Sequence, residues 1–275
     1  MELQAALQGI HLSSPDPLQL ARFYSSAYEM ALEPVGYDSY RCRAPGRQVA
    51  FSGGPANQLK FAHFAFHTGA AWDAFRTRVW NPAQPPLPPG FEAGAAITFC
   101  DPDGNQIVFT APAEPALPAP VHVRPAALQH FALRTAQLDA MLDFYTGQLG
   151  FVLSDAVRDA EGALRACFLR SDSLHHSLAL FFAPAACFDH QSFEASGWDS
   201  MKAWGDHMAG LRVPIVWGIG RHGPGNDVFF MVRDPDGNLA EISAEIEHCA
   251  PGRPAGLWPH EERTLNLWGK AILRS

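Results

Sequence analysis

The stretch RDPDGNLAEIS (residues 233–243) has a near-copy, CDPDGNQIVFT (residues 100–110), earlier in the same chain. Asp-Pro followed by Asp-Gly-Asn is typical of a tight turn in which the glycine takes a left-handed conformation, and the residues after it predict a strand. The second copy carries Glu241 in this strand, where the first carries Val108. The repeat predicts a duplicated fold, and the added carboxylate predicts a functional site in one copy only.

Other features repeat in the same order on both sides of a central segment. Each half carries a histidine, an amphipathic helical pattern, a second histidine and the turn: His11, residues 17–32, His63 and Asp101 in the first half, and His130, residues 136–153, His190 and Asp234 in the second. The offsets between the paired histidines and the paired turns are 119, 127 and 133 residues. We therefore pair His11 with His130 and His63 with His190, and attribute the drift to loop insertions.

The coarse pattern within each half indicates two βαβββ modules. A strand with a histidine precedes a helix, and apolar residues at helical spacing in the second half are Leu138, Met141, Leu142, Tyr145 and Leu149. Segments with period-2 alternation follow each helix. The predicted fold class is α+β, with four βαβββ modules in two tandem domains.

A proline-rich connector separates the halves. Residues 111–125 contain five prolines, which suit an extended segment and neither a helix nor a central strand. We predict a non-catalytic N-terminal domain (1–112), a linker (113–126), a catalytic C-terminal domain (127–248) and a tail (249–275). The tail is rich in apolar and aromatic residues, so it is expected either to cover the active site or to pack at a subunit interface.

Composition excludes several classes of protein. The 275 residues are 47% hydrophobic with a formal charge of −8 and no basic stripe, so nucleic acid is not an expected partner. No run of 18 apolar residues and no leader pattern is visible, and we expect a soluble cytoplasmic protein without a membrane partner. The five scattered cysteines predict reduced thiols rather than a disulfide or zinc framework.

Four such modules, the helix-to-strand joint DFYTGQLGF (143–151) and the repeated D-P-D-G-N turn resemble the vicinal oxygen chelate superfamily. The resemblance spans about residues 6 to 247. The two-domain layout is most similar to type I extradiol dioxygenases, such as the catechol 2,3-dioxygenases and dihydroxybiphenyl dioxygenases. The resemblance implies a glyoxalase-like fold, a bound metal and a homo-oligomer.

In this family the strands that carry His130, His190 and Glu241 line one cup-like sheet, so the resemblance implies that the three residues are metal ligands. Two neutral imidazoles and one carboxylate form a facial triad that suits Fe(II) or Mn(II) and leaves three positions open. The first half keeps His11 and His63 but offers Val108, which cannot be a ligand. We therefore expect the first half to be structural.

The resemblance also implies two catalytic histidines. His176, in the segment HHSLA, matches the family's acid/base group, which near its ordinary pKa of about 6.5 could take a proton from a catechol and return it. A solvent-facing histidine at a strand edge is the alternative. His222 matches a position that hydrogen-bonds substrate or oxygen, and Asn226 and Asp227 are expected to orient it or contact the substrate.

One position departs from the family pattern. Similar enzymes carry a tyrosine three residues before the turn aspartate, where this chain has Met231. Either another donor such as His222 replaces the tyrosine, or the substrate differs. Aromatic residues expected around the substrate are Phe181, Phe182, Trp217 and Phe229.

The resulting hypothesis is a non-haem Fe(II)-dependent extradiol dioxygenase that cleaves an aromatic vicinal diol with O2, as in aromatic compound degradation. The alternatives are a glyoxalase-like metal-dependent isomerase or epimerase, which usually needs a second glutamate, and a ligand-binding protein of the same fold, which needs no triad. The sequence does not distinguish iron from manganese.

Overall fold

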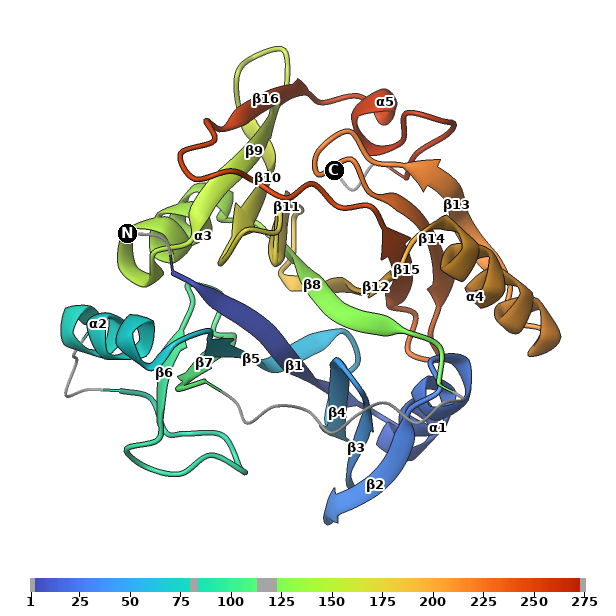
Figure 1. Cartoon of the computed structure of the whole chain (residues 1–275), viewed down its shortest axis with the longest axis horizontal. Helices are drawn as coiled ribbons and strands as arrows, with labels where there is room; N and C mark the ends of the chain where they lie inside the picture. Colours follow the sequence, from blue (N-terminus) through green and yellow to red (C-terminus); the bar gives the residue numbers. More distant parts are fainter. Residues whose placement is uncertain (1–2, 80–83, 113–122, 273–275) are drawn as a thin grey trace.

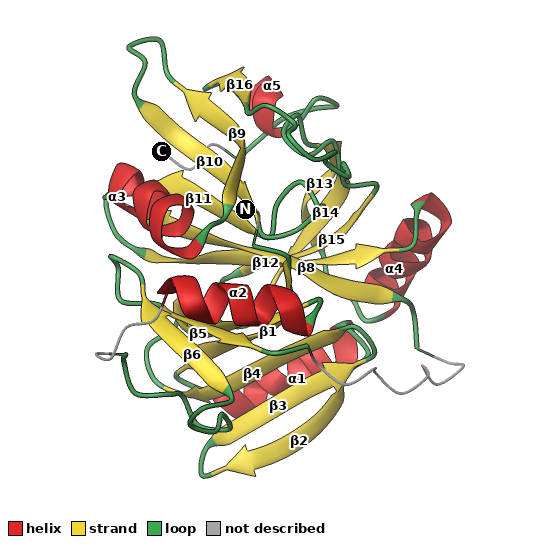
Figure 2. Ribbon diagram, turned by 60° about the vertical axis from the view of Figure 1, so that its left-hand side comes forward, coloured by secondary structure: helices red, strands yellow, loops and turns green. Residues whose placement is uncertain are grey.

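The computed structural model describes residues 3–79, 84–112 and 123–272. Two mixed β-sheets, one of seven and one of nine strands, lie one above the other, with helices on their outer faces and between them (Figures 1 and 2). The predicted α+β fold of two similar halves is confirmed. The first half contains β1 (Ala5–Ser14), α1 (Pro17–Ala27), β2 (Ala31–Gly36), β3 (Ser39–Ala44), β4 (Arg47–Gly53), β5 (Gln58–Phe66), α2 (Gly69–Val79), β6 (Ala96–Cys100) and β7 (Gln106–Thr110).

The second half repeats this order and adds a short tail. It contains β8 (Ala126–Thr135), α3 (Leu138–Asp143), the π-helical turn η1 (Phe144–Leu149), β9 (Val152–Arg158), β10 (Leu164–Arg170), β11 (Leu178–Phe182), β12 (Cys187–Ala195), α4 (Trp198–Gly210), β13 (Ile215–Arg221), β14 (Val228–Arg233), β15 (Leu239–Ala244), β16 (Gly256–Pro259) and α5 (Glu262–Leu265). The strand order is β2-β3-β4-β1-β5-β7-β6 in the first sheet and β13-β14-β15-β12-β8-β11-β10-β9-β16 in the second.

The second module departs from the predicted βαβββ pattern. Within the described residues only β6 and β7 follow α2, whereas three strands follow the helix in each of the other modules. Residues 84–95 form an irregular loop apart from one isolated bridge. Four prolines in residues 85–89 explain this, because proline cannot donate to a strand ladder.

Two tyrosines and the aspartates of the two repeated turns join the halves to each other. The Tyr24 hydroxyl, in α1 of the first half, donates to Asp234 Oδ2 in the second half at 3.1 Å. The Tyr145 hydroxyl, in the second half, donates to Asp101 Oδ2 in the first half at 2.9 Å. All four side chains are buried. Each turn aspartate therefore shapes its own hairpin through Oδ1 and holds the other half through Oδ2.

Apolar packing forms two clusters. The larger cluster runs through both halves and includes the buried faces of α1, α3 and α4. The smaller cluster lies on the concave face of the nine-stranded sheet and includes Phe168, Phe181, Trp217, Met231 and Leu265. The second cluster forms the wall of the candidate site.

Three further findings bear on the sequence predictions. Residues 113–122 of the predicted linker lie outside the described residues. All five cysteines, each in the described part of the chain, are free. None of the helices in the described ranges is long and apolar enough to cross a membrane.

Candidate metal centre and active site

Three neighbouring strands bring the predicted ligands together. Ser192 in β12 pairs with His130 in β8 on one side and with Glu241 in β15 on the other. His190 lies two residues before Ser192 on β12, so its side chain points to the same face of the sheet. The predicted convergence of His130, His190 and Glu241 is therefore present in the structure, with the ligand atoms within 4.8 Å of one another.

Two β-bulges orient the histidine rings. The register between β8 and β12 shifts at Gln129 and at Asp189, each of which directly precedes one of the histidines. His130 Nδ1 lies 2.7 Å from Gln129 Oε1, and His190 Nδ1 lies 2.6 Å from Asp189 Oδ1. Because both partner atoms are acceptors, each Nδ1 carries the proton and each Nε2 keeps a lone pair. In a regular strand successive side chains point to opposite faces of the sheet. A bulge allows two successive side chains to lie on the same face, where they can form a hydrogen bond.

Among the residues that the structure describes, none offers these three ligand atoms a partner that explains their positions. The two Nε2 atoms of His130 and His190 face each other at 3.1 Å, so two lone pairs are opposed. Glu241 Oε2 lies 3.7 Å from His190 Nε2 and, within the described residues, accepts no hydrogen bond. Ligands at right angles around an ion at about 2.1 Å would lie about 3 Å apart. The residues therefore fit a divalent metal ion.

The charge states at neutral pH suit this donor set. Burial lowers the pKa of His130 to about 3, so its imidazole is neutral. Burial would raise the pKa of Glu241, but the neighbouring His222, His130 and His190 hold it below its ordinary value. Two neutral imidazoles and one carboxylate leave a divalent ion with one positive charge, which favours a mono-anionic ligand in a buried pocket.

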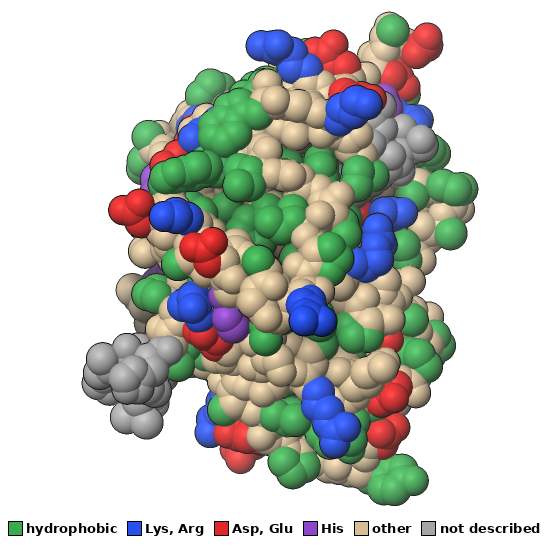
Figure 3. All heavy atoms as spheres, turned by 90° about the vertical axis from the view of Figure 1, so that its right-hand side faces the viewer, with side chains coloured by type: hydrophobic (Ala, Val, Ile, Leu, Met, Phe, Trp, Pro, Cys, Tyr) green, Lys and Arg blue, Asp and Glu red, His purple; other side chains and the backbone are tan. Residues whose placement is uncertain are grey.

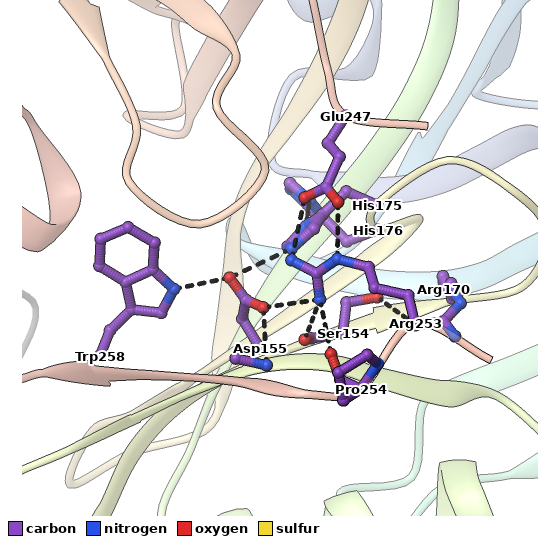
Figure 4. A network of polar contacts seen from close by, with 10 residues as sticks. Ser154, Asp155, Arg170, His175, His176, Glu247, Arg253, Pro254 and Trp258 are labelled. Atoms are coloured by element: carbon purple, nitrogen blue, oxygen red, sulfur yellow. Dashed lines mark hydrogen bonds and ion pairs between the residues drawn. The ribbon is translucent and has the colours of Figure 1, made fainter. Parts of the chain in front are cut away.

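A chain of buried polar groups runs from the pocket to the C-terminal tail (Figure 4). His176 Nδ1 lies 3.0 Å from His175 Nδ1, and His175 Nε2 lies 3.3 Å from Asp155 Oδ2. Trp258 Nε1 in β16 donates to Asp155 Oδ2 at 2.6 Å, and Arg253 donates to Oδ1 at 3.1 Å. Burial would raise the pKa of Asp155, but the close contact with His175 and the hydrogen bonds from these two tail residues favour the charged carboxylate and hold the pKa below its ordinary value.

This chain fixes which nitrogen of His176 faces the pocket with a free lone pair. Because Asp155 is an acceptor, His175 carries its proton on Nε2 and accepts through Nδ1. His176 must then donate through Nδ1, which leaves a lone pair on its Nε2. The ring of His176 lines the pocket with its centroid 4.3 Å from that of His130.

The structure excludes the alternative considered for His176 and corrects one expectation about it. The residue is 2% exposed, so it is not a solvent-facing histidine. Its pKa is also not near the ordinary value, because burial and then the neighbouring His130 and His175 lower it well below 6.5. In the absence of a ligand, His176 is therefore a neutral acceptor.

His222 lies on the opposite side of the candidate metal site. Its Nδ1 donates to the Leu265 carbonyl oxygen at 2.6 Å, and its Nε2 lies 4.0 Å from Glu241 Oε2. The ring stacks on Phe229 at 3.8 Å. Burial lowers the pKa of His222, but Glu241 and Asp227 outweigh it and raise the pKa above its ordinary value. Burial raises the pKa of Asp227 to about 7, and neither of its carboxyl oxygens has a partner in the described residues.

The pocket at the site is small, with a cavity of about 20 Å³. It is lined by His130, Phe168, His176, Ala179, Phe181, His190, Trp217, His222, Pro224, Met231 and Leu265. Of these lining residues, Leu265 belongs to the predicted tail. Met231 pairs with Glu241 across β14 and β15 and lines the pocket.

Two predicted substrate contacts do not lie at this pocket. The Phe182 ring is 4.5 Å from the Arg165 guanidinium and packs against the larger core, because it follows Phe181 on β11 and points to the other face. Asn226 is exposed at a left-handed position of its loop, where its backbone carbonyl accepts from Arg221.

The strand registers correct the pairing of the histidines between the halves. In the first sheet Gly9 pairs with His63 and Phe61 with Gln106, as His130 pairs with Ser192 and His190 with Leu239 in the second. The positions equivalent to His130, His190 and Glu241 are therefore Gly9, Phe61 and Val108. His11 and His63 are displaced by two residues, and they hydrogen-bond Ser52 and Thr110. The prediction that they occupy the equivalent positions is wrong, and the first half retains no member of the triad.

Sequence reasoning missed the residues that orient the histidines. Gln129 and Asp189 precede His130 and His190 directly in the sequence, and this adjacency was a visible signal. Asp155 and the tail residues Arg253 and Trp258 lie about 20 and 80 residues from His176, and only the fold brings them near it.

Comparison with known proteins agrees with the fold. Residues 127–242 match the model of the Glyoxalase/Bleomycin resistance protein/Dioxygenase superfamily. Metapyrocatechase 2 of Cupriavidus necator is 31% identical over 206 residues, which cover 66% of this chain and 62% of that protein. The chain thus spans less than two thirds of the length of this relative.

Two solved structures share the fold over essentially the whole chain. Homoprotocatechuate 2,3-dioxygenase from Brevibacterium fuscum, in complex with 3,4-dihydroxyphenylacetate, has a TM-score of 0.80 at 20% identity and covers 99% of this chain and 91% of that one. The Mn(II)-bound glyoxalase from Novosphingobium aromaticivorans has a TM-score of 0.79 at 23% identity and covers 100% and 93%. Residues 127–242 of this chain are thus similar to the Glyoxalase/Bleomycin resistance protein/Dioxygenase superfamily, and the chain shares its fold with these two solved structures.

Proposed function

We propose that the protein is a non-haem Fe(II)-dependent extradiol dioxygenase that cleaves a catechol-type ring with O2. The observation that carries the proposal is the pair of opposed Nε2 atoms of His130 and His190 beside Glu241 Oε2, which accepts no hydrogen bond from the described part of the chain. The name of the metapyrocatechase relative and the dioxygenase fold support the substrate class. Manganese would fit the same three ligands.

His130, His190 and Glu241 would hold the ion. When bound, the ion supplies a Lewis acid for both diol oxygens and a path for electrons from the ring to O2. The polypeptide supplies the remaining work: it orients the donors through Gln129 and Asp189, removes and returns a proton, and excludes water.

His176 is the proposed acid/base group. Its Nε2 lone pair can accept a proton from a diol hydroxyl in the pocket, while its Nδ1–H stays bound to His175. The imidazolium that forms is stabilised through His175 by the charged Asp155. In the empty pocket His176 is a weak base, because its pKa is low. An anionic substrate beside it raises its proton affinity.

His222 is the proposed second catalytic group. Met231 has no O–H or N–H to offer a substrate oxygen, and the Nε2 of His222 lies across the same site. With Nδ1 donating to Leu265, a protonated His222 would donate through Nε2 to a developing anion. Asp227 beside it keeps this positive charge favourable.

Closure of the tail removes water from the reacting atoms. A cavity of about 20 Å³ has room for a water molecule but not for an aromatic ring. Substrate entry therefore requires Leu265 and its neighbours in the tail to move, and their return seals the pocket.

The wider assignments are proposals of the same kind. We assign catalysis to residues 127–248 and a non-catalytic role to residues 1–112, in a cytoplasmic enzyme without nucleic-acid or membrane partners. A homo-oligomer is supported by exposed apolar side chains on the edge strand β13, on α4 and in the tail, since Ile219, Trp198 and Trp268 are each about half exposed. Figure 3 shows apolar side chains gathered on this side of the molecule.

The test is oxygen consumption by anaerobically prepared, iron-loaded protein with a panel of catechols from single-ring to biphenyl-sized diols. Uptake of one O2 per diol with formation of a yellow ring-opened product is expected. Absence of uptake with every diol would refute the proposal.

A glyoxalase-like isomerase is the second candidate. Met231 in place of the family tyrosine and the similar fold of a Mn(II)-bound glyoxalase favour it. Isomerase activity with the same metal-loaded protein, without O2 uptake, would select this candidate.

A further inference from the structure

The first half contains a cavity of about 590 Å³ that the proposed reaction does not use. We call it the N-terminal cup. It is lined by Gly9, Ile10, His11, Val35, Gly36, Ser39, Arg41, Gln48, Ala50, Ser52, Lys60, Phe61, His63, Pro88, Pro89, Gly90, Phe91 and Gln106. Its volume lies within the range of about 300–1,000 Å³ that is usual for ligand sites.

The floor of the cup corresponds to the metal site of the second half. Gly9 and Phe61 stand at the positions of His130 and His190, as the strand registers show. Gly9 carries no side chain where His130 projects its imidazole, and the Gln48 side chain packs against this position, with Nε2 3.3 Å from where a Cβ would lie. Phe61 adds an aromatic wall. The cup is therefore wide and apolar where the other half is narrow and metal-binding.

The charge of the cup is opposite to that of the metal site. Lys60 occupies the bulge position that Asp189 holds in the second half, and within the described residues it forms no ion pair. None of the described residues that line the cup is acidic, although Arg41 is paired with Glu33 just outside it. Burial lowers the pKa of both His11 and His63 to about 4, so they add no charge. Lys60 thus favours an anion.

Aromatic rings form one wall of the cup. Phe61 and Phe91 meet edge to face with centroids 5.5 Å apart. His63 contacts Phe91 at 5.0 Å, and His11 contacts Phe61 at 5.1 Å. All four side chains are only partly buried, so apolar ring surface faces the cavity. Covering such surface with a planar ligand is favourable.

We propose that the N-terminal cup is a second binding site that takes a small aromatic carboxylate, with the ring against Phe61 and Phe91 and the carboxylate at Lys60. The site is non-catalytic, since none of the triad residues is present there. It does not depend on ring cleavage by the second half.

The test is isothermal titration of the full-length, metal-free protein with benzoate, and with benzamide as the uncharged analogue. Benzoate is expected to bind at one saturable site per chain, and more tightly than benzamide. Because Lys60 is exposed, Lys60→Gln leaves the fold intact and should weaken benzoate binding about fivefold, the magnitude of one partly exposed ion pair.

Two further variants locate the site. Lys202→Gln removes an exposed cation on α4 and is the matched control, so benzoate affinity should be unchanged. Glu241→Ala should also leave it unchanged, because the metal pocket lies in the other half. The proposal is overturned if benzoate does not saturate, or if Glu241→Ala abolishes binding while Lys60→Gln has no effect.

Discussion

At the scale of single residues, metal binding depends on which ring nitrogen of each histidine carries the proton. Asp189 holds the proton of His190 on Nδ1 and so aims Nε2 at the metal position. Asp189→Asn keeps the shape but weakens this acceptor, and it should weaken metal binding by about tenfold to a hundredfold. Metal titration of the variant against Asp199→Asn, an exposed position on α4, checks this; equal affinities would contradict it.

Asp155 acts on catalysis through His175 and not by touching substrate. Asp155→Asn removes the charge that stabilises a protonated His176, so kcat should fall about tenfold or more while metal content and KM change little. Trp258→Phe removes one donor to the same carboxylate and should have a smaller effect in the same direction. A fall in KM or metal content without a fall in kcat would assign Asp155 a structural role instead.

The triad was predictable from the sequence because the residue types stood at positions that match a known family. His11 and His63 were wrongly paired with His130 and His190, because the halves were aligned by matching histidines and not by matching the register of the strands. Aligning ALQGIHL (6–12) with ALQHFAL (127–133) places Gly9 opposite His130, as the structure does. The prediction that Phe182 contacts the substrate was wrong for the same reason, because successive residues of a strand point to opposite faces of the sheet.

At the scale of elements, the repeated turns connect the two halves, and Asp234 in the second turn makes the stability of the fold depend on pH. Burial raises the pKa of Asp234 to about 6, so across about pH 4 to 6 the folded state holds a proton that the unfolded state has lost. Stability therefore falls as pH rises through this window.

The asparagine of Asp234→Asn cannot titrate. Between pH 4 and 6 the free energy of unfolding of the wild type should therefore fall relative to that of the variant, by on the order of 2 kcal/mol. Urea unfolding of both proteins at several pH values measures the difference. A difference that stays constant from pH 4 to 7 would contradict the buried, protonated aspartate.

The module pattern itself was visible in the sequence, with two exceptions. The turn glycines Gly104 and Gly237 have φ of 87° and 88°, as the turn type requires. The prolines after α2 indicate an irregular segment, but the prediction of four complete modules did not allow for the strand that this segment replaces. The β-bulges at Gln129 and Asp189 were not predictable, because they arise from the packing of one strand against another.

At the scale of the whole molecule, the halves form one structural unit. A common core and the reciprocal bonds of Tyr24 and Tyr145 couple them. Urea should therefore unfold the chain in a single transition, with tryptophan fluorescence and far-ultraviolet circular dichroism changing together. Two separated transitions would mean that the halves are stable independently.

The central claim is that one divalent ion, held by His130, His190 and Glu241, makes this chain a ring-cleaving dioxygenase. Glu241→Gln keeps the size of the side chain and removes its charge. The decisive measurement is iron content together with catechol-dependent O2 uptake in this variant and in the wild type. The account predicts about one iron per wild-type chain with O2 uptake, and a loss of both in Glu241→Gln; full iron and full uptake in the variant would contradict it.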